Sequence, residues 1–181
     1  MKKAVKSLVV VLAMIGAISP ALAQVKYDKG DKLFSVGLGI GGYVDGFYSY
    51  DYYGGGYYYS SGYGIPITAS LEFFINDAIS IGPYAGFAFG NHWTAFDAGA
   101  RGSYHFSKHI PLGTDKLDLY GTVLAGVSNI WYDYAGVDDS DFAGRFGITA
   151  GARWYFTNSF AVNAEVGWGV TPVLAGVSFK F

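Results

Sequence analysis

The chain has 181 residues, with 12 lysines and arginines against 14 aspartates and glutamates, a formal charge of −2. It has no cysteine, which excludes disulfides, thiolate catalysis and a lipid anchor attached through cysteine. Charged residues make up only 14% of the chain, whereas glycine occurs 27 times, tyrosine 16 times and phenylalanine 14 times. Such a composition is unusual for a soluble domain.

The N-terminus has the organisation of a secretory signal peptide. A basic stretch, residues 2–6, precedes an apolar run, residues 8–18, and Ala21-Leu22-Ala23 is a small-x-small cleavage site. A retained membrane anchor is the alternative, but the run is shorter than the roughly 20 residues that a helical span needs. We expect a cleaved signal peptide, 1-23, and one domain, 24-181, which keeps nine basic and fourteen acidic residues. Its formal charge of −5 argues against a nucleic-acid partner.

Alternation of apolar and polar residues dominates the domain and indicates β-strands with two unlike faces. No stretch after residue 23 approaches 18 consecutive apolar residues, so no helical span is expected. A closed barrel is the other structure that satisfies its own backbone in lipid. The pattern therefore predicts an all-β fold, a transmembrane antiparallel up-and-down β-barrel of eight strands. The predicted strands are 34–40, 65–73, 79–89, 96–106, 117–127, 142–156, 160–168 and 173–181.

All the charged residues within these strands share the parity opposite to the apolar one. Because a barrel must keep charge off its lipid face, we expect them to face the lumen and to pair there. A water-soluble barrel such as a lipocalin would have the opposite arrangement of faces. The four acids and four bases balance in three rough layers: Glu72, Asp118, Arg153 and Lys180; then Arg101 and Glu165; then Asp97 and Arg145.

The predicted connections alternate in length. Tight turns at 76–77 and 157–159 and a longer connection at 107–116 lie on one side, which the even number of strands makes periplasmic. The other side has a long connection at 43–62, a medium one at 129–141 and short ones near His92 and Thr171. Pro83, which cannot donate to a ladder, predicts a bulge or a misplaced register. Aromatic girdles are expected at both rims, with Trp93 in the outer one.

The export segment, the eight amphipathic strands and the closing strand together resemble the small outer-membrane barrels of the OmpX, OmpA and OmpW type. The resemblance covers residues 24–181 and implies a location in the cell outer membrane, among outer-membrane lipid and lipopolysaccharide. It also implies that the barrel-assembly machinery recognises the closing strand through Val177, Phe179 and Phe181. No periplasmic domain of the OmpA kind is expected after Phe181.

A tyrosine-rich stretch between the first two predicted strands is the candidate surface-binding loop. Exposed tyrosine offers flat amphipathic area at low entropic cost, which suits an extracellular protein or glycan. The alternative is a low-complexity loop that packs on itself and on lipopolysaccharide. The candidate residues are Tyr48, Tyr50, Tyr52, Tyr53, Tyr57, Tyr58 and Tyr59.

Catalytic and metal-binding patterns are weak. The spacing of His105 and Ser107 resembles the His-x-Ser pair of the outer-membrane lipid A deacylase, but His105 is predicted to point into the lumen near the periplasmic rim. The acidic run 133–141 lacks the glycine and distal glutamate of an EF-hand loop, so a solvated loop is expected rather than a calcium site. We expect no catalytic residue, cofactor or metal.

Two function classes remain, with a lipid-modifying enzyme as a distant third. One is a structural or surface-interaction barrel with a plugged polar lumen, acting through its outer loops. The other is a narrow pore for ions or small solutes. The balanced lumen favours the first, because an eight-stranded barrel is only wide enough for its own side chains.

Overall fold

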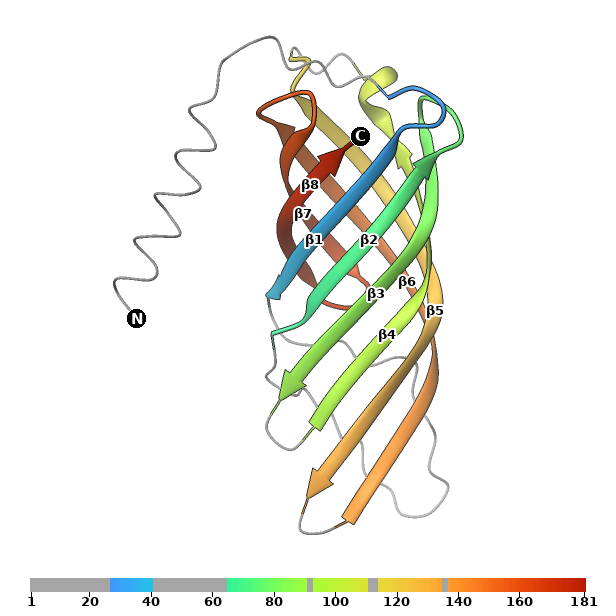
Figure 1. Ribbon diagram of the computed structural model, residues 1–181, viewed down its shortest axis with the longest axis vertical. Helices are drawn as coiled ribbons and strands as arrows, with labels where there is room; N and C mark the ends of the chain where they lie inside the picture. The colour runs from blue at the N-terminus through green and yellow to red at the C-terminus, as the bar shows by residue number, and fades with distance from the viewer. Residues whose placement is uncertain (1–26, 41–64, 91–92, 111–113, 135–136) are drawn as a thin grey trace, which may run out of the picture.

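The structure, a computed structural model, describes residues 27–40, 65–90, 93–110, 114–134 and 137–181. Eight antiparallel strands form one closed barrel, in which β1 pairs with β8 as well as with β2 (Figure 1), and this confirms the predicted fold class. The strands are β1 (Lys32–Ile40), β2 (Ile67–Phe74), β3 (Ile79–Gly90), β4 (Trp93–His105), β5 (Leu117–Tyr134), β6 (Val137–Tyr155), β7 (Phe160–Trp168) and β8 (Val173–Lys180), with the 3-10 helix η1 (Phe106–Lys108) after β4.

The first and last strands close the barrel in continuous register, from Leu33↔Lys180 to Ile40↔Val173. One step further, the amide of Lys32 donates to the carbonyl of Phe181 over 2.8 Å, and the carbonyl of Lys32 accepts the amide of Phe181 over 3.0 Å. Closure leaves the sheet without an edge, so its backbone groups are paired where lipid offers no partner. Among the described residues, no helix has the length and apolar character needed to cross a membrane.

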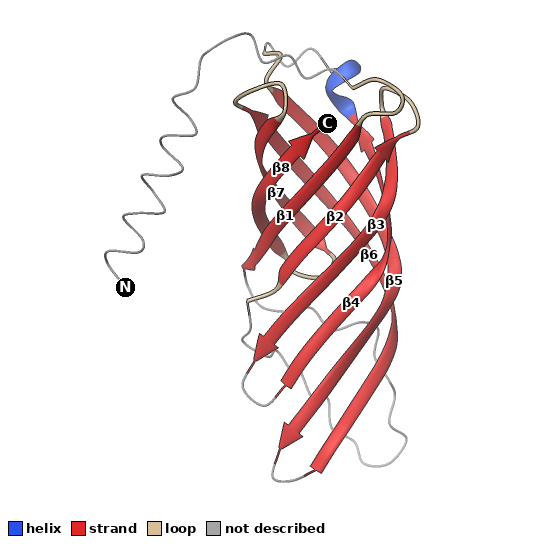
Figure 2. Cartoon of the chain, in the orientation of Figure 1, coloured by secondary structure: helices blue, strands red, loops and turns tan. Residues whose placement is uncertain are grey.

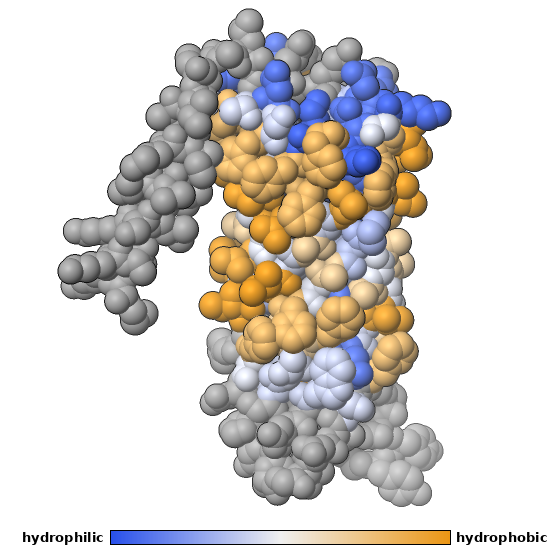
Figure 3. All heavy atoms as spheres, in the orientation of Figure 1, coloured by the Kyte–Doolittle hydropathy of each residue, from blue (hydrophilic) through white to orange (hydrophobic). Residues whose placement is uncertain are grey.

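The two faces of the sheet differ as the alternation predicts. On β1, Phe34, Val36 and Leu38 are exposed, whereas Ser35 and Gly37 between them are buried. Figure 3 shows the same pattern over the visible side of the barrel: apolar side chains cover the wall, and hydrophilic ones gather at one end. A continuous apolar wall of this size is a surface made for lipid rather than for water.

The end that carries the short connections is called the turn end. Between β2 and β3, the side-chain oxygen of Asn76 accepts the amides of Ala78 and Ile79, both over 2.8 Å. Between β6 and β7, the side-chain oxygen of Thr157 accepts the amide of Phe160 over 3.0 Å. Short polar side chains that accept backbone amides stabilise tight turns, and both turns occur where the sequence predicted them. Figure 2 shows η1 and the end of β8 at this same end.

The opposite end is called the hairpin end, because β5 and β6 extend beyond the other strands there (Figure 2). Their pairing continues through Asn129↔Phe142 and Trp131↔Ser140 to Tyr134↔Val137. The predicted medium connection at 129–141 is therefore wrong, and this segment is mostly strand. Outside the lipid-facing part of the barrel, two strands can pair through their backbone groups without an apolar face. The alternation of apolar residues therefore ends before β5 and β6 end.

The predicted bulge or misplaced register at Pro83 is also wrong. The register between β2 and β3 is the same on either side of the proline, with Phe73↔Ile81 before it and Ser70↔Tyr84 after it along β3. On the other side, Pro83 pairs with Ala100 in an unbroken ladder between β3 and β4. The missing N–H thus interrupts one ladder locally without shifting the strands.

Candidate functional site

The interior of the barrel is the candidate site, because the charged side chains of the strands gather there. Of the eight charges predicted for the lumen, seven are at most 8% exposed, and the eighth, Lys180, lies at the turn end with 20% of its side chain exposed. Inward parity places each of them, since alternate residues of a strand point to opposite faces. The seven enclosed residues are Glu72, Asp97, Arg101, Asp118, Arg145, Arg153 and Glu165.

Arg101 of β4 links two carboxylates in the middle of the lumen. Its Nη2 donates to Oε1 of Glu165 over 2.8 Å, and its Nε lies 3.4 Å from Oε1 of Glu72. Glu165 also accepts the hydroxyl of Tyr120 over 3.0 Å and that of Thr149 over 3.2 Å. Charges enclosed in a narrow interior need such partners, because desolvation without them is costly.

Asp118 of β5 collects donors nearer the turn end. Its Oδ2 accepts Nη1 of Arg153 over 2.9 Å, Nδ1 of His105 over 2.9 Å and the hydroxyl of Tyr27 over 2.7 Å. Its Oδ1 accepts the hydroxyl of Ser107 over 2.7 Å. Asp118 therefore joins β4, β5, β6 and the residues that precede β1.

Toward the hairpin end, Arg145 of β6 forms an ion pair with Asp97 of β4. Both side chains are at most 1% exposed. A second nitrogen of Arg145 donates to the carbonyl of Gly169 over 3.3 Å, which ties this pair to the connection between β7 and β8.

The predicted layers are only partly correct. Glu72 pairs with Arg101 and so bridges two of the predicted layers, because tilted and staggered strands bring together residues from different predicted heights. Lys180 pairs over 3.4 Å with Asp31, a residue outside the predicted strands. The enclosed charges are thus four acids and three bases, and the sequence-based balance of four against four does not describe them. The predicted balance also did not count His105, whose Nδ1 lies 2.9 Å from Oδ2 of Asp118.

Ser80, His105 and Asp118 form a row of neighbouring side chains, but the hydroxyl of Ser80 donates its proton to Oε2 of Glu72 over 2.8 Å, so this proton is not directed at His105 as it is in a serine hydrolase. Nε2 of His105 lies 3.0 Å from the hydroxyl of Ser80, and Nδ1 lies 2.9 Å from Asp118. Sequence analysis singled out Ser107 instead, which donates to Asp118. Attack on a carbonyl requires a substrate atom about 3–3.5 Å from the nucleophile. Ser80 and His105 are 0% and 1% exposed, so in this conformation the group is closed to substrate.

An apolar cluster closes the lumen toward the hairpin end. Tyr84, Leu124, Ile130 and Val170 are its largest buried members, and Trp93 packs against it. Val170 belongs to the connection between β7 and β8, which therefore bends into the lumen. The prediction that Trp93 belongs to the outer girdle is wrong, because its parity on β4 is that of the buried Ala95.

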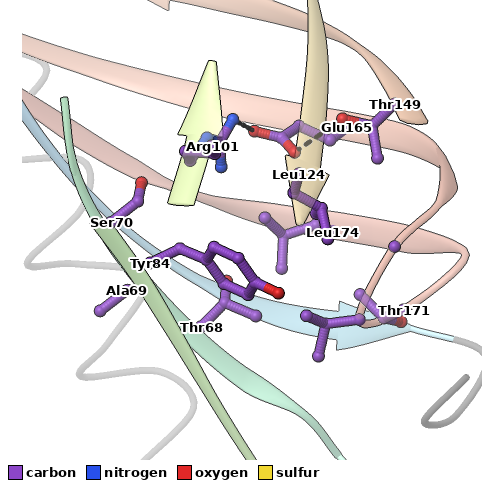
Figure 4. Close-up of a pocket in the computed structure, with 12 residues that line it drawn as sticks. Thr68, Ala69, Ser70, Tyr84, Arg101, Leu124, Thr149, Glu165, Thr171 and Leu174 are labelled. Atoms are coloured by element: carbon purple, nitrogen blue, oxygen red, sulfur yellow. Dashed lines mark hydrogen bonds and ion pairs between the residues drawn. The ribbon is translucent and has the colours of Figure 1, made fainter. Parts of the chain in front are cut away.

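A cavity lies between this cluster and the Arg101–Glu165 pair. Its volume is about 30 Å³, which is room for about two water molecules. Figure 4 shows Tyr84 and Thr171 across the cavity from that pair. The hydroxyl of Tyr84 is buried and has no hydrogen-bond partner among the described residues.

Some of the remaining predicted residues lie on the outer face of the barrel, and the others lie outside the residues that the structure describes. Val177 and Phe179 lie on the outward parity of β8, and Phe181, one residue beyond its end, continues this parity. Phe179 packs against Phe160 with ring centroids 5.3 Å apart. The tyrosines of the candidate loop, residues 48–59, lie outside the described residues, as do the side chains of the acidic residues at 133, 138, 139 and 141. No group of three potential metal ligands occurs in the described part of the chain.

A closed eight-stranded antiparallel barrel with an apolar wall and ion pairs inside defines a class: the small outer-membrane β-barrel. Comparison with known proteins agrees with this class at the level of the fold. Neither family models nor curated protein sequences match the chain.

Solved structures do match. The N-terminal β-barrel domain of OprF from Pseudomonas aeruginosa is 17% identical, with a TM-score of 0.59, over 85% of this chain and 98% of that one. Ail, the attachment invasion locus protein of Yersinia pestis, is 13% identical, with a TM-score of 0.52, over 84% and 99%. Neisserial surface protein A is 15% identical, with a TM-score of 0.52, over 83% and 96%. The structural neighbours are thus small outer-membrane barrels, and the likeness is one of fold.

Proposed function

We propose that this protein is an integral outer-membrane barrel that passes no solute and acts as a structural or surface-interaction protein through its outer loops. The observation that carries the proposal is the filled lumen. Ion pairs occupy its middle, the hydrogen-bond network around Asp118 fills its turn end, and an apolar cluster fills its hairpin end. The cavity between this cluster and the ion pairs has room for about two waters.

Single-channel recording of the refolded protein in planar bilayers tests the sealed lumen. We expect no stable conductance steps from the pure protein, because an ion would have to displace paired charges in a narrow interior. Reproducible steps would instead support the alternative, a narrow pore for ions or small solutes.

The candidate partner is an extracellular protein or a glycan without negative charge. Ail has been solved in complex with the heparin analogue sucrose octasulfate, so a barrel of this fold can bind a polyanion. In this chain, however, residues 41–64 and 129–141 contain six acids and no lysine or arginine. Such acidic segments repel a sulfated ligand, whereas the tyrosines at 48–59 suit stacking on sugars or apolar contact with a protein.

Binding assays on intact cells test the loop. Replacing Tyr57, Tyr58 and Tyr59 by serine should reduce adhesion to glycan-coated or host-cell surfaces severalfold while leaving the barrel folded. The matched control replaces Ser60 and Ser61 by alanine in the same segment. Equal adhesion of both variants would contradict a binding role for the tyrosines.

Two further proposals concern biogenesis. The exported protein should begin at Gln24, which intact mass of membrane-extracted protein checks; retention of residues 1–23 would contradict cleavage.

Deleting Phe181, the last outward aromatic of the closing strand, should lower surface levels in cells far more than it lowers refolding in detergent. Normal surface levels would exclude this terminus as an assembly signal.

A further inference from the structure

Tyr27 enters the lumen at the turn end from the residues that precede β1, and it is only 4% exposed. A turn directs it there: the amide of Asp31 donates to the carbonyl of Asp28 over 3.1 Å, and the amide of Asp28 to the carboxylate of Asp31 over 3.1 Å. Gly30 adopts φ +98°, which other residues rarely adopt. Its amide donates to the carbonyl of Phe74 over 2.9 Å and so fastens the turn to the end of β2.

The ring of Tyr27 fits an aromatic pocket. It stacks on Phe74 with ring centroids 4.1 Å apart and an interplanar angle of 14°, and its centroid lies 4.8 Å from that of His105. Tyr155 meets it edge-on at 6.3 Å, and Nζ of Lys180 lies 5.7 Å from its centroid. These contacts surround a flat ring with two other aromatic rings, an imidazole and a cation, which suits its shape and its negative faces.

The hydroxyl of Tyr27 is also recognised. It donates to Asp118 over 2.7 Å, lies 2.9 Å from the hydroxyl of Tyr155 and accepts Nη1 of Arg153 over 3.4 Å. Since its single proton goes to Asp118, Tyr155 is the donor of the second bond. Burial raises the pKa of Tyr27 well above its ordinary value, so the group stays a neutral donor. The pocket thus offers hydrogen-bond partners to a phenol hydroxyl as well as contacts to an aromatic ring.

We propose that the turn end of the lumen is a phenol-binding site, occupied by the chain's own Tyr27, and that Tyr27, held by the turn through Gly30, is a removable stopper over the buried Ser80, His105 and Asp118. The proposal deepens the proposed function, because it rests on a sealed lumen and names what seals one end. Removing the ring opens this end to small molecules as far as His105. It does not open the barrel from end to end, because the apolar cluster around Leu124 and Val170 remains.

Carbethoxylation of histidines with diethyl pyrocarbonate, followed by peptide mass mapping of the folded protein in detergent, tests the stopper. His105 is 1% exposed and His109 is exposed, so the rate at His105 is expressed relative to that at His109. We expect Tyr27→Gly to raise the relative rate at least tenfold. Tyr27→Phe, which keeps the ring, should raise it about twofold. Adding p-cresol should restore protection to Tyr27→Gly, and toluene should do so much less.

A second variant acts on the turn without touching the lumen. A side chain at Gly30 meets no atom within 4 Å but is strained at φ +98°, so Gly30→Ala should loosen the stopper and raise the relative rate several-fold. Gly144→Ala is the control, because its side chain also enters open space and φ there is not positive. Heat-modifiable migration in gels identifies the folded fraction, and only that fraction is scored.

The outcomes separate the two proposals. If His105 is as protected in folded Tyr27→Gly and Gly30→Ala as in the wild type, the stopper is excluded, whatever the conductance of the wild type. If p-cresol and toluene protect equally, the site does not recognise the hydroxyl and the phenol-binding proposal fails. If the wild type conducts ions while Tyr27→Gly exposes His105, the sealed barrel fails and the stopper stands.

Discussion

The two ends of the lumen are closed by different chemistry. At the turn end, a polar network converges on Asp118, which accepts bonds from Tyr27, His105, Arg153 and Ser107. At the hairpin end, aliphatic and aromatic side chains fill the space, a cavity of about 30 Å³ remains, and the hydroxyl of Tyr84 has no partner among the described residues. A polar closure requires every group to be satisfied, whereas an apolar closure tolerates imperfect packing.

Removing the centre of the polar closure should have the largest effect. Asp118→Ala leaves Arg153 buried without its carboxylate partner, and breaking a buried ion pair from one side costs about 3–5 kcal/mol. Equilibrium urea unfolding in lipid vesicles measures the loss. Asp31→Asn is the control, because the Asp31–Lys180 pair is partly exposed and should contribute less than about 1 kcal/mol. Equal losses would mean that Asp118 does not hold the turn end together.

Truncating the apolar closure should cost less. Leu124→Ala removes a side chain that is 7% exposed and lies beside the existing cavity, so the loss should fall near the lower end of the usual range, at about 2 kcal/mol. The same vesicle titration measures it. Ala88→Gly, at a buried position of the same cluster, is a small-volume control. A loss above that of Asp118→Ala would reverse the ranking of the two closures.

The smallest effects should come from a matched pair of tyrosines, one bonded and one not. Tyr120→Phe removes a hydroxyl that donates to Glu165 over 3.0 Å and should cost about 1.5 kcal/mol, since the acceptor is charged. Tyr84→Phe removes the hydroxyl without a described partner and should be neutral or slightly stabilising. A clear loss for Tyr84→Phe would show that ordered water in the cavity bonds this hydroxyl.

Much of the barrel could be predicted from the sequence because the period-2 pattern is local. Alternation on β1 and β8 separated the lipid face from the lumen face, and seven enclosed charges follow from parity alone. The tight turns at Asn76 and Thr157 carry their own side-chain acceptors. Where the alternation stopped, at 129–141, the prediction stopped with it, although backbone pairing continues to Tyr134↔Val137.

The partners inside the lumen were decided only by the tertiary structure. Which carboxylate meets which base depends on strand stagger, so Glu72 meets Arg101 and Lys180 meets Asp31. Tyr27 shows the limit most clearly: it lies outside every predicted strand, and only the turn through Gly30 brings its ring to Phe74 and its hydroxyl to Asp118. The sequence by itself determined the barrel and its faces, because each residue's side of the sheet is a local property. Contacts across a closed lumen are long-range, and they exist only once all eight strands have paired.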